Sequence, residues 1–347
     1  MDTESLIATR DELIRNPEMH RPHVVFLGAG ASVAACPQGD KNGRHLPTME
    51  NFVDIIGLAP LLTTHGITNV HENFEALYSR LVLDQSKSGL IQTIETTVHD
   101  YFASLELPDY PTVYDHLLLS LRKKDAIFTF NWDPFLFDAY VRNQRFGLPE
   151  IFFLHGSVRT AYCPSHPTRY GAQWLHCPEC HSKLVPTKLL YPVKNKNYAS
   201  DEFLASVWDA AKWFLESAFT LTIFGYGAPA SDTEAVDLMK DAWNRVGQKL
   251  IERVEIIDIK PPATLYDTWR PFISHHHYDC RSCFYQSFIA KYPRRSSEAI
   301  FAPSVHGRVA EHFPLPRRFS FDELYEWLEP IAQSETETKG VVKSSAG

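Results

Sequence analysis

The stretch HVVFLGAGAS, residues 23–32, is an apolar run that ends in a glycine-rich turn. A short run without polar alternation is typical of a strand buried on both faces of a parallel sheet. A Gly-x-Gly turn directly after such a strand either packs closely on neighbouring backbone or holds a nucleotide phosphate. The stretch alone does not separate these two interpretations, and the residues that follow the other strands have to decide.

Four further apolar runs have the same character, and helical patterns lie between them. The runs are residues 126–130, 151–154, 221–224 and 254–257. One apolar stripe of helical period precedes the fourth strand and another follows it: Phe203, Val207, Ala211, Phe214 and Ala218, then Val236, Met239, Trp243 and Val246. Alternation of strands and helices predicts an α/β fold, a Rossmann-like parallel sheet with helices on both faces.

Two segments interrupt this alternation. Residues 34–110 are too long for one crossover and contain several helical patterns, and residues 158–195 carry paired cysteines among prolines. We predict that these insertions form a smaller lobe of helices and a zinc ribbon. The expected organisation is an N-terminal segment 1–21, helical over residues 3–15, followed by one domain over 22–333 that contains both insertions.

Composition limits the classes of function. The 347 residues carry a net charge of -8, so the chain lacks the basic excess that direct nucleic-acid binding favours. No apolar run approaches the roughly 20 residues of a membrane span, and the acidic start is unlike a secretory signal. Four of the six cysteines lie in two close pairs, which favours metal ligation in a reducing compartment, so we expect a cytoplasmic protein. The polar segment 334–347 predicts a disordered tail.

Polar or glycine residues follow each of the five strands. Because ligands bind at the carboxyl ends of parallel strands, these residues are candidates for one site. They are Gly28, Ala29, Gly30 and Ser32; Thr129, Asn131 and Asp133; His155; Gly225, Gly227 and Ser231; and Asp258. Each also has a structural interpretation: Asp133, and Ser231 with the neighbouring Asp232, as helix caps, and His155 as a core histidine. Their joint position at one sheet edge favours a binding site.

The second insertion contains residues with metal-ligand spacing. Cys163, His166, Cys177 and Cys180 are separated by two, ten and two residues, which suits a tetrahedral structural zinc. His176 and His181 are alternatives for the histidine ligand, and free thiols in a loop are the structural alternative. The pair Cys280 and Cys283, near His275, His276 and His277, is interpreted as thiols on a late strand, with a second metal site as the alternative.

The order GAGAS, TFNWD, HGS and a cysteine-rich insertion resembles the sirtuin-like family of NAD-consuming enzymes, over roughly residues 22–290. The resemblance implies NAD+ as substrate and Zn²⁺ as a structural ion. It implies that the turn with Gly28, Ala29, Gly30 and Ser32 holds the pyrophosphate, since a helix start favours negative charge. Thr129, Gly225, Gly227, Ser231 and Asp258 would complete the NAD+ site, with the last on the adenosine ribose.

The resemblance also implies three catalytic roles. Asn131 would position the ribose or the attacking water, Asp133 would bind the nicotinamide amide, and His155 would act as the base. Three departures from the deacylase pattern weaken peptide binding: VAACPQGDKNGRHLPT after the glycine turn, Phe130 where glutamine is usual, and LLYPVKNKNY after the ribbon. The chain is more similar to NAD+ hydrolases of bacterial antiviral defence.

Two alternatives stay open at this level. One is an NAD-dependent protein-lysine deacylase or an enzyme that transfers ADP-ribose to another acceptor. The other is a non-catalytic sensor of NAD or ADP-ribose. A hydrolase that depletes NAD+ must be held inactive at rest, so we expect a homo-oligomer or an activating protein partner.

Overall fold

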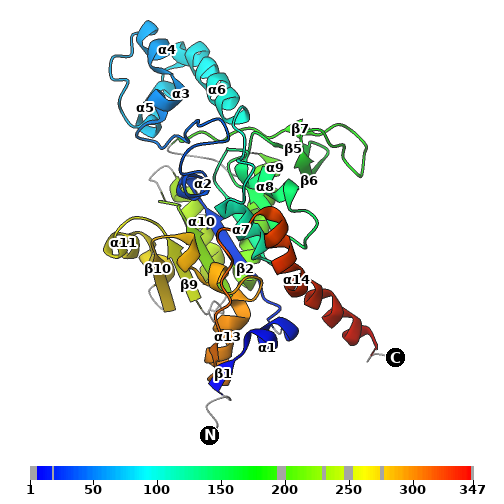
Figure 1. Cartoon of the computed structure of the whole chain (residues 1–347). Coiled ribbons are helices and arrows are strands. Elements are labelled where there is room, and N and C mark those ends of the chain that lie inside the picture. Colours follow the sequence, from blue (N-terminus) through cyan, green and yellow to red (C-terminus); the bar gives the residue numbers. More distant parts are fainter. Residues whose placement is uncertain are drawn as a thin grey trace.

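The computed structural model describes residues 6–17, 19–193, 201–228, 232–245, 253–273 and 277–344 (Figure 1). Its centre is a six-stranded sheet in the order β10-β9-β8-β2-β3-β4, in which every pair is parallel. The strands are β2 (His23–Leu27), β3 (Ala126–Thr129), β4 (Glu150–Phe153), β8 (Thr220–Phe224), β9 (Arg253–Ile257) and β10 (His277–Arg281). The five predicted strands are therefore confirmed, with shifts of about one residue at their ends.

The strand order is that of a Rossmann sheet. The first strand of this sheet, β2, is central and pairs with β3 on one side and β8 on the other. The chain fills one half of the sheet through β4, then returns across the fold to start the other half at β8. The carboxyl ends of β2 and β8 form the topological switch point, where ligands bind in open α/β sheets.

Helices cover both faces of the sheet, as predicted. Alternate residues of β2 face opposite sides: Val24 and Phe26 join one core cluster, Val25 and Leu27 another. The first cluster includes residues of α9 (Glu202–Ser217), α10 (Thr233–Arg245) and α11 (Pro262–Ile273). The second includes residues of α2 (Ala29–Ala35), α7 (Val113–Leu119) and α8 (Phe135–Arg142).

Each insertion folds into a unit of its own beside the sheet (Figure 1). The first builds α3 (Phe52–Ile56), α4 (Ala59–Thr64), α5 (Phe74–Val82) and α6 (Ser88–Ala103), which we call the helical lobe. Its core includes a stacked pair, Phe52 on Phe74, with ring centroids 4.0 Å apart. The second folds into a three-stranded antiparallel ribbon of β5 (Thr160–Cys163), β6 (His166–Ala172) and β7 (Val185–Pro186).

The N-terminal helix is shorter than predicted. Residues Ile7–Ala8 form strand β1, which pairs with β11 (Val309–Ala310), and α1 spans Arg10–Arg15. The helix begins there because Thr9 and Glu12 form a capping box: Thr9 Oγ1 accepts from the Glu12 amide, and the Glu12 carboxylate accepts from the Thr9 amide. Upstream of this helix, the apolar residue Ile7 lies in strand β1 instead.

The prediction of a disordered tail over residues 334–347 is wrong for the start of that segment, which is helical. After α12 (Phe288–Lys291) and α13 (Ser296–His306), helix α14 runs from Phe321 to Ser344. Glu335 binds the guanidinium groups of Arg294 and Arg295, and both arginine side chains are almost fully buried. A buried cation requires a counter-charge, so the start of this polar segment is packed. None of the described helices combines the length and apolar character of a membrane crossing.

Candidate functional site

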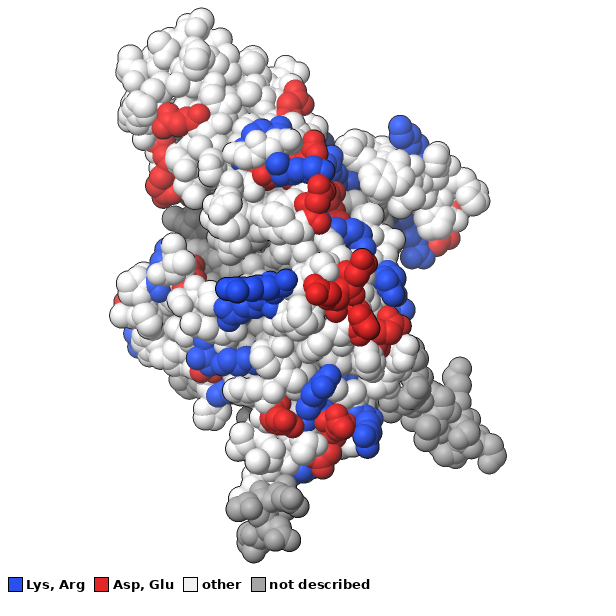
Figure 2. Space-filling model, in the orientation of Figure 1, with Lys and Arg blue, Asp and Glu red and all other residues white. Residues whose placement is uncertain are grey.

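A cavity of about 420 Å³ opens at the switch point, between the carboxyl edge of the sheet and the helical lobe. Figure 2 shows a hollow between that lobe and the body of the domain, and acidic and basic side chains are mixed over this face. Ten of the predicted site residues line the cavity: Gly28, Ala29, Gly30, Ser32, Asn131, Asp133, His155, Gly225, Gly227 and Asp258. Ser231 lies outside the described residues.

The glycine turn packs against the loop after β8. The Gly28 amide donates to Phe224 O at 3.0 Å, and the Gly30 amide donates to Gly225 O at 2.9 Å. A Cβ at Gly28 would lie 2.5 Å from Tyr226 Cα, which excludes any side chain there. These two glycines thus bring two loops into backbone contact, while the Ala29 amide, first in its helix, has no intrahelical partner.

Ser32 is the centre of a buried hydrogen-bond network. Its hydroxyl donates to Asp133 Oδ2 at 2.6 Å and lies 2.6 Å from the Tyr114 hydroxyl. Asn131 Nδ2 donates to Ser32 Oγ at 2.9 Å and to Gly28 O at 2.8 Å. Both amide hydrogens of Asn131 are therefore engaged, and its amide oxygen is the group that remains to accept from a ligand or water.

Two further residues support this network, and only one of them could be predicted from the sequence. Thr129, a predicted site residue, is fully buried and does not line the cavity; its Oγ1 accepts from the Asn131 amide at 3.1 Å. Tyr114 comes from α7 and was missed, because nothing in its local pattern distinguishes it from a core aromatic residue. Burial keeps the pKa of Tyr114 well above its usual value, so its hydroxyl stays protonated.

Asp133 combines both roles that its sequence context suggests. One carboxylate oxygen accepts from the Phe135 amide at 3.1 Å, at the start of α8, and the other accepts from Ser32. Burial raises the pKa of Asp133 to about 6. The carboxylate is consequently ionised at neutral pH, at a cost to the stability of the fold.

The substitution Asp133→Asn is expected to stabilise the protein at pH 7.5 by about 1–3 kcal/mol, because a shift of one pKa unit corresponds to about 1.4 kcal/mol. The folded-state pKa is raised, so the cost of ionisation is present above about pH 6 and disappears as the pH falls below the unfolded value. Denaturant unfolding of both proteins from pH 4 to 8 measures this. An advantage of the variant that is equal at pH 4 and pH 7.5 would contradict it.

His155 lies on the cavity wall between an aromatic ring and a carboxylate. Its ring meets Phe130 edge-on with centroids 4.9 Å apart, and Nε2 is 3.8 Å from Asp232 Oδ1. The backbone is fixed by the Leu190 amide, which donates to His155 O at 2.9 Å. Sequence reasoning interpreted Asp232 only as part of a helix cap and Phe130 only as a departure from a pattern.

The helical lobe supplies the far wall of the cavity, which the sequence did not indicate. Phe52 and Phe102 meet Trp132 edge-on, with centroids 6.4 and 5.7 Å apart. The Trp132 indole N–H is buried and has no hydrogen-bond partner in the described part of the chain. Glu50, Glu75 and, from the loop after β9, Lys260 also line the cavity. The cavity therefore has both aromatic and charged side chains in its walls.

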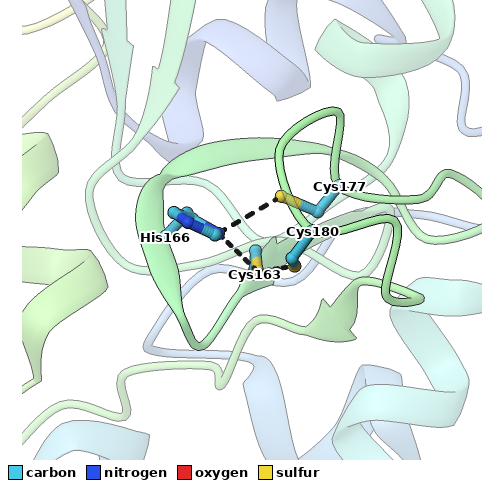
Figure 3. Close-up of side chains that lie close together, drawn as sticks. All are labelled: Cys163, His166, Cys177 and Cys180. Atoms are coloured by element: carbon cyan, nitrogen blue, oxygen red, sulfur yellow. Dashed lines mark hydrogen bonds between the residues drawn. The ribbon is translucent and has the colours of Figure 1, made fainter.

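The ribbon brings four ligand atoms together. The atoms of Cys163, His166, Cys177 and Cys180 lie within 4.8 Å of one another, and Figure 3 shows the side chains converging. The sulfurs of Cys163 and Cys180 are 3.5 Å apart. His166 Nδ1 is 3.7 Å from the Cys163 sulfur and 3.6 Å from the Cys177 sulfur. A tetrahedral zinc with bonds of about 2.3 Å to sulfur requires about 3.8 Å between sulfurs. The donor set fits structural zinc.

The surroundings of this cluster agree with metal ligation. Burial, followed by hydrogen bonds with Cys180 and Cys177, raises the pKa of Cys163, and hydrogen bonds led by the Ser182 amide lower the pKa of Cys180 to about 6. His176 and His181 are exposed and lie outside the cluster, so His166 is the histidine of the set. Among the described residues no second such group occurs; Cys280 lies in β10, and His275 and His276 are not described.

Neither a family model nor a curated protein matches the sequence. In overall fold the chain is similar to Sir2 structures. A Sir2 protein in complex with an inhibitor, 2'-O-acetyl-ADP-ribose and a deacetylated peptide matches with a TM-score of 0.37 and 14% identity, over 83% of this chain and 94% of that one. Two mutants of a Sir2 homologue, each in complex with ADP-ribose, match with TM-scores of 0.38 and 15% identity, over 88% of this chain and 99% of theirs.

Proposed function

We propose that this protein is a sirtuin-like NAD+ hydrolase that cleaves the nicotinamide–ribose bond and releases nicotinamide and ADP-ribose. The observation that supports this most is the convergence of His155, Asn131 and Asp133 on one cavity at the switch point of the sheet. A module that only binds a nucleotide needs the glycine loops but not a histidine, an amide and a buried carboxylate beside them.

The reaction requires a held ribose, an activated water and a recognised leaving group. Water adds to the anomeric carbon as nicotinamide departs with the bonding electrons, and the proton of the water passes to His155 and then to solvent. The free oxygen of Asn131 accepts from this water and orients it. The Asp133 carboxylate accepts a hydrogen bond from the carboxamide N–H of nicotinamide. The Ala29 amide and the loops at Gly28, Gly30, Gly225 and Gly227 border the pyrophosphate, with Asp258 at the adenosine ribose.

Water is favoured over an acyl-lysine as the acceptor. Phe130 stacks on Tyr226 with centroids 4.0 Å apart and presents an edge to His155, so aromatic rings border the base. The segments that would pair with a peptide also differ from the deacylase pattern. A role in antiviral defence, with an oligomer or protein partner that controls NAD+ loss in the cytoplasm, is part of the same proposal.

The test is nicotinamide release from NAD+ by purified protein, with and without an acetylated peptide. We expect release without peptide, reduced at least about 100-fold in His155→Ala, since general base catalysis contributes 10²–10⁴-fold. His65→Ala is the matched control, because His65 is exposed on the helical lobe and its imidazole Nδ1 lies 2.9 Å from the Leu61 carbonyl oxygen, away from the cavity lining.

Each other outcome identifies an alternative. Release that requires the peptide would indicate a deacylase. Binding of NAD+ in calorimetry without release, with candidate activators present, would indicate a sensor. Equal release by the wild type and by His155→Ala would contradict the proposed catalytic site.

A further inference from the structure

Asp232 is a buried carboxylate beside the proposed base. It precedes α10 and is 3% exposed, while His155 follows β4 and is 5% exposed. Oδ1 of Asp232 lies 3.8 Å from Nε2 of His155. At this separation an opposite charge in a buried setting strongly favours the charged form of an imidazole.

Neighbouring groups hold the Asp232 carboxylate in place. The Tyr226 hydroxyl donates to Asp232 Oδ2 at 3.0 Å. Tyr226 stacks on Phe130 with an angle of 12° between the rings, and Phe130 meets the ring of His155 edge-on. The four side chains therefore form a closed cycle in which the carboxylate and the imidazole fix each other's orientation.

The other ionisable groups of the cavity stand apart from this cycle. Asp133 binds Ser32 and the Phe135 amide, and Asp258 accepts from the Lys260 amide at 2.9 Å. Glu50 and Glu75 come from the helical lobe, and Lys260, from the loop after β9, also lines the cavity. Of the described residues, Asp232 is the charged group that forms an ion-pair contact with His155.

We propose that Asp232 is a positioning residue for His155: it fixes the orientation of the imidazole and stabilises the imidazolium formed when His155 accepts a proton. This rests on the proposed hydrolase. Asp232 acts through His155 and does not contact the reacting atoms. The arrangement follows the general pattern in which a base is oriented by a third group.

The direct test is the titration of His155 by NMR in histidine-labelled protein, with its signal assigned by its absence in His155→Ala. In Asp232→Asn we expect the midpoint of the His155 titration to fall by about 1–3 pH units, since a nearby opposite charge favours the imidazolium by that amount. Tyr226→Phe keeps the ring stack and frees the carboxylate, so a smaller fall is expected. Asp237→Asn, on the exposed face of the same helix, is the matched control and should leave the midpoint unchanged.

Kinetics provide a second readout. In Asp232→Asn, kcat should fall about 10- to 100-fold with KM nearly unchanged, and the acid limb of the pH–rate profile should move to lower pH. An unchanged midpoint and an unchanged acid limb would overturn the proposal. The titration requires no turnover, so absence of nicotinamide release from the wild type would count against the hydrolase and not against the pairing of Asp232 with His155.

Discussion

Cys177→Ser is expected to lose the bound metal and to unfold the ribbon. The apolar core of the ribbon is only Ala161, Cys163, Cys177 and Leu184, too small to hold three short strands together. Structural zinc contributes about 10–16 kcal/mol of apparent binding free energy in comparable small sites, so metal binding supplies most of the local stability. Metal analysis should find about one zinc per chain in the wild type and almost none in the variant.

The ribbon also holds the segment that carries His155. Thr187, just after β7, accepts from the Ser157 amide at 3.2 Å and donates to Ser157 O at 3.1 Å. Loss of zinc should therefore lower nicotinamide release more than tenfold and speed hydrogen exchange over residues 160–186. Cys283→Ser is the matched control, because Cys283 lies outside the cluster and should keep the zinc. Full zinc content in Cys177→Ser would contradict the ligand assignment.

Gly225→Ala is expected to destabilise the fold by about 2–5 kcal/mol. Gly225 has a φ of +60°, a conformation that costs other residues about 1–2 kcal/mol. A Cβ there would also lie 2.3 Å from the Ala31 amide nitrogen, so backbone must move at the junction of β2 and β8. Overpacking of this kind costs about 1–3 kcal/mol more.

Gly57→Ala separates the two contributions. Gly57 has a φ of +78° at the end of α3, but a Cβ there would meet nothing within 4 Å. We expect this variant to lose only the conformational cost, about 1–2 kcal/mol in denaturant unfolding. Equal losses in the two variants would show that the close approach of the two loops does not limit residue 225.

The sheet and its ligand edge could be predicted because five of its six strands contain a continuous apolar run, whereas β10 does not. The residues after those runs, from Gly28 to Asp258, then fall at one edge by the rules of parallel sheets. The zinc ligands were equally accessible, since their spacing is local. Thr129 fell in the right motif, but it lies behind Asn131 and not on the cavity wall.

The missed residues depend on packing between distant segments. Tyr114 reaches Ser32 from α7, and Phe102 reaches Trp132 from the helical lobe, so no local pattern reports either contact. Asp232 stands directly after the predicted site residue Ser231, but a role at the start of a helix was a sufficient local explanation for it. The polar segment at Glu335 suggested disorder because its buried partners, Arg294 and Arg295, lie forty residues away.

The position of β2 in the sheet has a consequence for synthesis of the chain. Of the six strands of this sheet, β2 is synthesised first, and its pairing with β8 joins His23 to Thr220. Pairings between such distant segments form late and slowly, because a long loop must close first. Asp258 and Lys260, which follow β9, also line the cavity. A nascent chain or a chain truncated before residue 258 therefore has no complete site, because both halves of the sheet supply walls of the cavity.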